Sequence, residues 1–508
     1  MKKLTIVLVL TCLATILPQQ SDNHKHKNFA FIKSTDSPEQ IISKAANVVP
    51  TRQQYNWQKM EFIAFAHFGM NTFTENEWGA GKEDPKLFNP TNFDARQWVR
   101  TFKNAGIKML ILTVKHHDGF CLWPSKYTEH SVKNSLWKNG KGDVVREVSE
   151  ACRELGLKFG VYLSPWDRNN PSYGDSLKYN EYFCNQLREL LTNYGEITEV
   201  WFDGANGEGP NGKKQVYDWQ SYYKVIRELQ PNAVIFGMAP DIRWVGTESG
   251  YGRETEWSVI PIDLSKMNEK IAAGKYPLDE IYQPHDIMGE DLGSRDKIKN
   301  ANGLFWYPAE TDVSIRPGWF YRSSQDTMVK SPEKLVDIYF NSVGRNSVLL
   351  LNVPPDKRGL LSNYDIKSLM GMKHILDKTF RTNLAKNAKI KSAGMKKIFN
   401  ASLIIDNNAY WTTIGKLDTA SIEFILPQKN RFDVALLQEE IRVGQRIEKF
   451  HLDFWNGTDW IKFADGTTVG YKRLLHFKPI KTNRVRLVIE QSRLNPTISN
   501  FGLYKLAD

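Results

Sequence analysis

The sequence predicts a (β/α) barrel followed by an antiparallel β-sandwich. Between Phe62 and about Pro355, short apolar strands alternate with helical segments. These strands are apolar on both faces, as is typical of parallel strands covered by helices. Repeated strand–helix units over roughly 300 residues favour a closed barrel. We therefore expect a barrel over residues 35–380, with an open doubly wound sheet as the alternative fold.

Short apolar runs next to helical segments are the predicted barrel strands. The predicted strands are 62–69, 109–115, 158–163, 199–202, 234–238, 303–307 and 348–352. The predicted helices are 95–105, 144–155, 181–194, 219–229 and about 360–380. No Gly-x-Gly-x-x-Gly motif follows the first strand, which removes the usual signal for a nucleotide site.

The sequence pattern changes at residue 384. Alternating polar and apolar residues predict strands at 421–426, 432–437, 449–454 and 484–489, and Asn456-Gly457 and Asp465-Gly466 predict turns. The segment is of typical size for a β-sandwich. We expect residues 384–508 to form this domain and to pack rigidly on the barrel, because no long Pro- or Gly-rich linker precedes it.

The composition limits the function classes. Fifteen Trp and twenty Tyr suit surfaces that stack on sugars, although a large barrel also uses aromatic residues as core filler. The net charge is +11, from 68 basic and 57 acidic residues, and no run of five or six basic residues occurs. Such scattered charge is typical of a solvated surface. We expect no nucleic-acid partner, and the oligomeric state is left open.

The first residues have the layout of a secretory signal. Lys2 and Lys3 precede the apolar run Leu4–Leu17, and Pro18 and a polar stretch end it. The run is too short for a comfortable membrane span. We expect residues 1–25 to be a signal peptide and the protein to be periplasmic or secreted. Cys12 makes a lipid anchor the less favoured alternative, because no small residue stands directly before it. No other segment could span a membrane.

Candidate site residues follow from a placement rule, because catalytic groups of such barrels lie at the carboxyl ends of the strands. These ends carry His67, His116, His117, Asp118, Tyr162, Trp166, Asp167, Trp201 and Asp203. Most of them are His, Asp or Trp, which are typical of a sugar site. The pattern favours carbohydrate chemistry.

Asp203 is the candidate nucleophile. It directly follows an apolar strand and precedes Gly204, so the backbone can turn beside a substrate. The alternative is a helix-capping Asp. A second carboxyl group would act as acid and base, and Glu248, Glu254 and Glu256 all lie in a glycine-containing loop after the next strand. The residues themselves do not choose among these three.

The pair His116-His117 could also indicate a metal. Adjacent residues on a strand point to opposite faces, and no nearby His, Asp or Glu completes a set of three ligands. Hydrogen bonding to sugar hydroxyls is the favoured interpretation. The four cysteines, at 12, 121, 152 and 184, form neither a zinc pattern nor a disulfide framework.

Five separated motifs resemble the α-L-fucosidases of glycoside hydrolase family 29. They are His67–Phe73 (HFGMNTF), Glu77–Gly79 (EWG), Lys115–Phe120 (KHHDGF), Trp201–Gly204 (WFDG), and Leu351–Pro355 (LNVPP) followed by Gly359–Leu361. The resemblance covers most of the barrel. It implies that Asp203 is the nucleophile of a retaining exo-α-L-fucosidase acting by double displacement, with no metal or organic cofactor. Trp166-Asp167 departs from the Glu-Trp pair of many relatives, so Asp167 stays unassigned.

The segment Trp244–Gly250 (WVGTESG) is similar to the acid/base segment of the subgroup restricted to α-1,3/1,4-linked fucose on branched glycans. Residues 438–450 are similar to the discoidin-like domain of that subgroup. The resemblance implies Glu248 as acid/base and fucosylated oligosaccharides or glycoconjugates as substrates. It implies the following fucose-binding residues: His67, Glu77, Trp78, His116, His117, Tyr162, Trp201 and Trp319. A broad-specificity fucosidase, a related glycosidase such as a galactosidase, a metal-dependent hydrolase and a non-catalytic sugar-binding protein are the alternatives.

Overall fold

The computed structural model describes residues 28–237, 241–262, 288–392, 410–415 and 417–507. The predicted signal peptide at 1–25, with Cys12, lies outside these residues. Within the described ranges, every helix is too short or too polar to cross a membrane.

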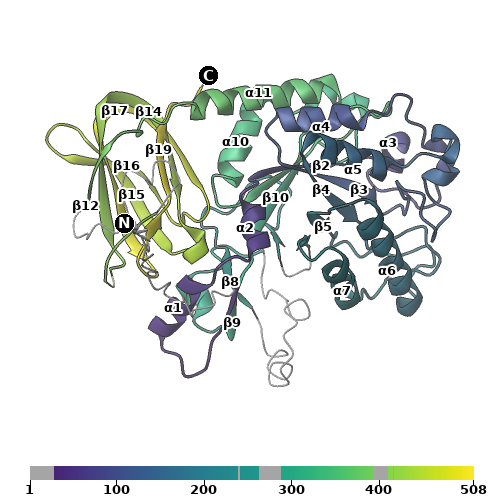
Figure 1. Cartoon of the computed structure of the whole chain (residues 1–508), viewed down its shortest axis with the longest axis horizontal. Coiled ribbons are helices and arrows are strands. Elements are labelled where there is room, and N and C mark those ends of the chain that lie inside the picture. The colour runs from purple at the N-terminus through teal and green to yellow at the C-terminus, as the bar shows by residue number, and fades with distance from the viewer. Residues whose placement is uncertain (1–27, 238–240, 263–287, 393–409, 416, 508) are drawn as a thin grey trace, which may run out of the picture.

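Eight parallel strands form the barrel (Figure 1). Their order is β6 (Val234–Phe236), β5 (Glu199–Trp201), β4 (Lys158–Leu163), β3 (Met109–Lys115), β2 (Phe62–Ala66), β11 (Val348–Asn352), β10 (Ala309–Ser314) and β7 (Arg243–Trp244). A parallel bridge between Phe236 and Ile242 joins the two ends of this order. The sheet is thus nearly closed, which confirms the predicted barrel.

Alternating side chains divide the barrel between two cores. On β2, Ile63 and Phe65 point into the barrel interior, whereas Phe62 and Ala64 pack outward against the helices. The outer helices are α4 (Ala95–Asn104), α5 (Val144–Leu155), α6 (Ser176–Asn193), α7 (Trp219–Leu229), α10 (Pro332–Ser342) and α11 (Asn363–Phe380). Further described helices of this part are α1 (Pro38–Asn47), α2 (Arg52–Gln58), α3 (Met70–Thr74) and α9 (Arg295–Ile298). Burial on both faces explains why the strands are almost uniformly apolar.

One strand prediction was wrong. Residues 303–307 are not a barrel strand, because β9 (Gly303–Trp306) lies between β1 (Phe29–Phe31) and β8 (Val259–Ile262) in a separate antiparallel sheet. The barrel instead uses β10, which carries the polar residues Glu310, Thr311 and Asp312. All three are buried inside the protein, so hydrophobic pattern alone could not identify this strand.

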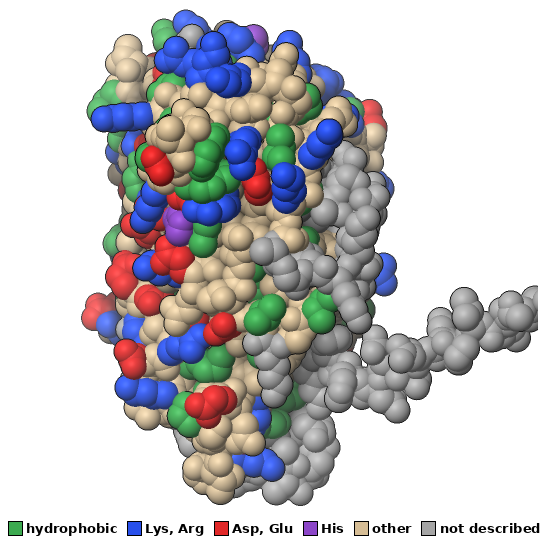
Figure 2. All heavy atoms as spheres, turned by 90° about the vertical axis from the view of Figure 1, so that its left-hand side faces the viewer, with side chains coloured by type: hydrophobic (Ala, Val, Ile, Leu, Met, Phe, Trp, Pro, Cys, Tyr) green, Lys and Arg blue, Asp and Glu red, His purple; other side chains and the backbone are tan. Residues whose placement is uncertain are grey.

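The C-terminal domain is an antiparallel β structure, as predicted. Its six-stranded sheet has the order β12 (Lys389–Ser392), β14 (Ala420–Gln438), β17 (Arg473–Ser492), β15 (Ile447–Trp455) and β16 (Trp460–Gly466), with β19 (Asn500–Tyr504) also pairing with β14. β13 (Trp411–Thr412) pairs with β18 (Thr497–Ile498). The predicted Asn456 turn closes the β15–β16 hairpin through a bond from Asn456 N to Asp459 O (3.1 Å). Figure 2 shows the face that this domain turns away from the barrel.

The two domains share buried polar contacts at residues 256–258. The backbone N–H of Glu256 donates to Thr468 Oγ1 (3.0 Å), and Gln445 Nε2 donates to the carbonyl oxygen of Glu256 (2.9 Å). The Glu256 carboxylate also forms a buried ion pair with Arg243 of β7. The C-terminal domain therefore holds the far end of the segment that leaves the barrel at Trp244.

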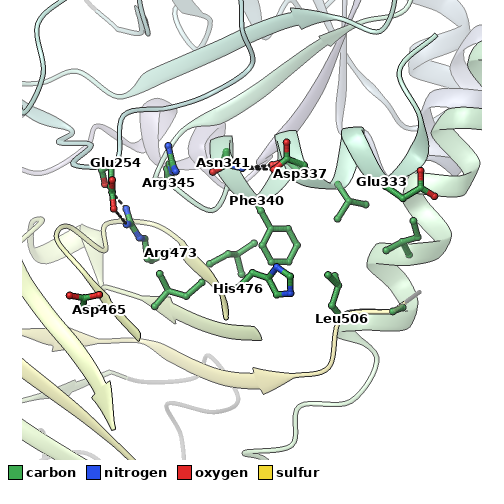
Figure 3. A pocket seen from close by; sticks show the side chains of 15 residues that line it. Glu254, Glu333, Asp337, Phe340, Asn341, Arg345, Asp465, Arg473, His476 and Leu506 are labelled. Atoms are coloured by element: carbon green, nitrogen blue, oxygen red, sulfur yellow. Dashed lines mark hydrogen bonds and ion pairs between the residues drawn. The ribbon is translucent and has the colours of Figure 1, made fainter. Parts of the chain in front are cut away.

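A cleft of about 480 Å³ lies between α10 and β17 (Figure 3). Phe340, Leu474 and Leu475 form part of its apolar lining. Glu254 stands at one side, with a carboxylate oxygen 4.0 Å from Arg473 Nη2. Glu254 thus points toward the C-terminal domain.

Candidate active site

Asp203 stands just beyond the end of β5, with its side chain 26% exposed. Tyr162 Oη donates to Oδ2 (2.9 Å), and the backbone N–H of Ala205 donates to Oδ1 (2.8 Å). The next helix, α7, is capped by Asp218, so Asp203 does not cap a helix. Both carboxylate oxygens are held in place while the side chain stays accessible, which is the arrangement that a nucleophile needs.

Three histidines lie beside Asp203. His67, His116 and His117 are all buried, and His117 Nε2 is 3.7 Å from Asp203 Oδ2. Burial lowers the pKa of His67 to about 3 and also lowers those of His116 and His117. Neutral imidazoles can both donate to and accept from the hydroxyl groups of an uncharged sugar.

The hydrogen-bond network fixes the tautomer of two of these rings. Asn352 Nδ2 donates to Ser314 Oγ and to the Trp319 carbonyl, so Asn352 Oδ1 accepts from His67 Nδ1 (2.8 Å). Ser164 donates to the Trp166 carbonyl oxygen and therefore accepts from His117 Nδ1 (2.7 Å). In both histidines Nε2 is left as a hydrogen-bond acceptor.

Aromatic rings form the walls of the site. Tyr162 stacks on Trp201 with ring centroids 5.2 Å apart, and His116 stacks on Tyr162 at 5.7 Å. Trp319 lies 5.1 Å from the His67 ring. Trp78 is 59% exposed and meets His117 edge to face at 6.1 Å. Such surfaces suit the apolar faces of a sugar ring.

Of the three candidate glutamates, Glu248 contacts another predicted site residue. Trp319 Nε1 donates to Glu248 Oε2 (3.2 Å), and Trp319 N donates to Glu77. The pKa of Glu248 is raised, chiefly by partial desolvation and further by the charges of Asp203 and Glu77, against the opposing effect of the Trp319 hydrogen bond. The Glu248 side chain remains exposed to solvent. Glu256 is buried in its ion pair with Arg243.

The sequence analysis named Trp244 only as the start of the segment that carries Glu248, and it did not name Asp312. Trp244 Nε1 donates to Asp312 Oδ1 (2.8 Å), and Asp312 is buried inside the barrel. Burial raises the pKa of Asp312 to about 7, with smaller effects of the same sign from Glu248 and Asp203. This contact fixes the strand end from which the Glu248 segment departs. The sequence does show a Trp four residues before Glu248. It does not show that this Trp pairs with Asp312 on β10.

Asp118 and Asp167 organise the surrounding loops. Asp118 accepts from the backbone N–H of Phe120 (2.7 Å), and Asp167 forms a buried ion pair with Lys115 (3.1 Å). Asp167 also accepts from two backbone N–H groups of the following turn. In the part of the chain that the structure describes, no three His, Cys, Asp or Glu side chains form a group suited to a metal ion.

A pair of buried carboxyl groups lies deeper in the barrel. Trp57 Nε1 donates to Glu199 Oε2, and Trp201 Nε1 donates to Glu310 Oε1, both at 2.8 Å. Burial raises the pKa of Glu199 to about 8 and that of Glu310 well above its usual value. Because Trp201 forms a wall of the site, Glu310 helps to hold that wall.

We expect Glu310→Gln to weaken the pH dependence of stability. Both folded-state pKa values exceed those of the unfolded chain, so this stabilisation is present below about pH 4.5 and is lost as pH rises through about 8. Thermal unfolding between pH 5 and 9 should show a smaller fall of Tm in Glu310→Gln than in the unmodified protein. Glu228→Gln, at an exposed position, is the control. An equal fall of Tm in all three proteins would contradict the raised pKa of Glu310.

Glu310→Ala should lower the free energy of unfolding by about 2–4 kcal/mol, since it leaves the Trp201 N–H unpaired beside a cavity.

Comparisons with known proteins identify the family of this chain. The sequence model of the alpha-L-fucosidase family matches residues 39–379. Alpha-L-fucosidase 1 of Arabidopsis thaliana is 42% identical over 466 residues, covering 90% of this chain and 87% of the plant protein. A Ruminococcus gnavus fucosidase of glycoside hydrolase family 29, solved with fucose, is 33% identical with a TM-score of 0.79, covering 91% of this chain and 95% of that one.

A further solved structure, a family 29 member from an unknown rumen bacterium, is 41% identical with a TM-score of 0.76. It covers 91% of this chain and 78% of that one. The family match spans the barrel, and the full-length similarity extends into the C-terminal domain. The chain therefore belongs to the α-L-fucosidases of glycoside hydrolase family 29.

Proposed function

We propose that this α-L-fucosidase is a retaining exo-enzyme in which Asp203 is the nucleophile and Glu248 the acid/base. The observation that carries the proposal is the contrast between two carboxyl groups that follow β5 and β7, the strands on either side of β6. Asp203 accepts two hydrogen bonds at fixed positions, whereas the pKa of Glu248 is raised. Pairs of carboxyl groups in unequal environments are how such enzymes separate nucleophile from acid.

In the first step, Asp203 attacks the anomeric carbon while protonated Glu248 gives its proton to the departing glycosidic oxygen. The C–O bond to the leaving group breaks as the fucosyl–Asp203 ester forms. In the second step, Glu248 takes a proton from water, whose oxygen displaces Asp203 and completes hydrolysis with retained configuration. A separation of about 5–5.5 Å between the two carboxyl groups is expected for this route.

We propose that fucose lies between the histidines and the aromatic walls. The acceptor Nε2 atoms of His67 and His117 would receive hydrogen bonds from fucose hydroxyls, with His116 and Glu77 as further polar partners. Trp201, Tyr162 and Trp319 would pack against the ring and its C5 methyl group. Trp78, exposed at the rim, would contact the sugar from the solvent side.

We further propose that the natural substrates carry α-1,3- or α-1,4-linked fucose on branched, Lewis-type glycans. The similarity of residues 244–250 and 438–450 to that subgroup supports this. The exposed Trp78 offers a surface for a second sugar next to fucose. The similarity of residues 438–450 also supports a discoidin-like C-terminal domain. The apolar run after Lys3 supports export of the protein.

The test is fucose release from a Lewis-type trisaccharide, 2′-fucosyllactose and an aryl α-L-fucoside, each with and without EDTA. Release mainly from the branched trisaccharide, unaffected by EDTA, would support the proposal. Similar release from all three would assign broad specificity. Binding of the trisaccharide without release would indicate a sugar-binding protein, and loss with EDTA would indicate a metal.

We expect Trp319→Phe to shift the basic limb of the kcat/KM profile to higher pH. The Trp319 N–H donates to the Glu248 carboxylate and so lowers the pKa of this group. Phe keeps the ring beside His67 but removes the donor, so Glu248 stays protonated to higher pH. The check is a pH profile on the trisaccharide, with Trp455→Phe in the C-terminal domain as control. A basic limb at the same pH in Trp319→Phe would argue against Glu248 as the acid.

A further inference from the structure

Most of the net positive charge of the protein comes from its C-terminal domain. Residues 384–508 contain 20 Lys and Arg and 12 Asp and Glu, a net charge of +8 out of the +11 of the whole chain. These residues make up about a quarter of the sequence. Strong charge asymmetry between domains indicates a partner of opposite charge.

A group of four cations gathers where β14 pairs irregularly with β17. Arg431 lies directly opposite Lys481 in the antiparallel ladder, and Lys429 and Lys478 lie two or three residues away from this pair. All four side chains are exposed. Like charges placed opposite one another in a sheet destabilise it. We call these four residues the basic ladder.

The basic ladder has no acidic partner among the residues that the structure describes, because no carboxylate oxygen lies within 4.0 Å of any of its four cations. The neighbouring acids are already engaged. Glu423 binds Arg484 (2.7 Å), and Asp453 binds Arg486. The like-charge repulsion therefore remains uncompensated within the described fold, as expected of a surface that receives an anion.

Two half-buried tryptophans adjoin the basic ladder. Trp455 and Trp460 face each other across the β15–β16 hairpin, with ring centroids 5.5 Å apart. The Arg484 guanidinium lies over both rings, at 4.8 and 5.3 Å. Thr482, the residue after Lys481, donates to the Trp455 carbonyl oxygen (3.0 Å), which joins the two groups. The surface thus offers charge and aromatic contact together.

Figure 2 shows that Lys and Arg outnumber Asp and Glu toward the upper end of this face, where Figure 1 labels β14 and β17. We propose that the basic ladder, with Trp455 and Trp460, is a binding surface for anionic polysaccharide. Carboxylate or sulfate groups would pair with the four cations, and the apolar faces of the sugar rings would pack on the indoles.

The test compares binding of dextran sulfate, polygalacturonate and neutral dextran to the full chain over a range of salt concentrations. Arg431→Gln/Lys481→Gln removes the opposed pair, and Trp460→Ala removes one ring. Lys367→Gln/Lys386→Gln, which removes two exposed cations elsewhere, is the matched control. Hydrolysis of the Lewis-type trisaccharide reports on folding and should be equal in all variants, since none of these residues belongs to the candidate site.

We expect binding of both polyanions and none of neutral dextran. The Arg431/Lys481 variant should bind about tenfold more weakly at low salt, with a slope of log affinity against log salt reduced by about 1–2, because fewer counterions are released. Trp460→Ala should weaken polygalacturonate binding without changing the slope. Equal losses in the test and control variants would overturn the proposal. So would tighter binding to DNA or to phosphatidylserine vesicles that does not depend on Trp460.

Discussion

Asp203→Gly is expected to lower kcat by about 10⁴-fold, since removing a catalytic nucleophile leaves only binding and the remaining catalytic groups. The fold should tolerate the change, because Asp203 lies in a partly exposed loop and its carboxylate pairs with one side-chain donor, Tyr162. The measurement is kcat on an aryl α-L-fucoside, with Tm as the folding control.

Sodium azide should restore part of this activity, because the small anion can attack from the face that Asp203 occupied. A single displacement by azide inverts the anomeric centre, so the product should be β-L-fucosyl azide, identifiable by NMR. Asp118→Asn is the matched control, as its carboxylate holds a loop, and azide should not activate it. If Asp203→Gly kept near-normal activity, or if azide gave the α-product, Asp203 would not be the nucleophile.

Glu248→Ala is expected to separate substrates by the basicity of their leaving groups. Loss of a general acid costs about 10²–10⁴-fold where the departing oxygen needs a proton, as in a trisaccharide. An aryl fucoside with an acidic phenol should lose much less in its first step. The basic limb of kcat/KM should also disappear, since it reports ionisation of Glu248, whose pKa is raised.

Glu254→Ala and Glu256→Gln serve as comparison variants for this assignment. Glu254 faces the cleft beside Arg473, so its loss should leave the pH profile unchanged. Glu256→Gln weakens a buried ion pair with Arg243 and should lower Tm while the basic limb persists. If Glu254→Ala or Glu256→Gln lost the basic limb while Glu248→Ala retained it, the acid/base role would belong to the glutamate changed in that variant.

The sequence predicted those elements whose residues are apolar on both faces. β3, β4 and β11, together with helices α5 and α7, have the predicted bounds, since buried parallel strands and amphipathic helices leave clear local patterns. β10 was not predicted because Glu310 and Asp312 point into the barrel, where the Trp201 and Trp244 N–H groups donate to them. A polar residue that is paired with a distant partner looks the same in the sequence as one that faces water.

The same limit applies to the site. His67, Tyr162 and Asp203 were accessible to prediction because strand ends converge at one face of a barrel. The contacts that support these residues could not be predicted, because the partners are far apart in the sequence. Asn352 and His67 are separated by 285 residues, and Asp312 and Trp244 by 68. Local patterns carry no information about such partners. The choice of Glu248 rested on the family resemblance. The fold places Glu248 beside Trp319, Glu254 beside Arg473 and Glu256 in a buried ion pair.

The contacts between the C-terminal domain and residues 256–258 have a consequence for protein synthesis. Gln445 and Thr468, which hold this segment, leave the ribosome about 190–210 residues after it. The barrel can begin to form while it is being translated, but the segment that carries Glu248 gains its final anchors only when nearly the whole chain has emerged. A chain released early would lack these anchors, so completion of the candidate active site is coupled to completion of translation.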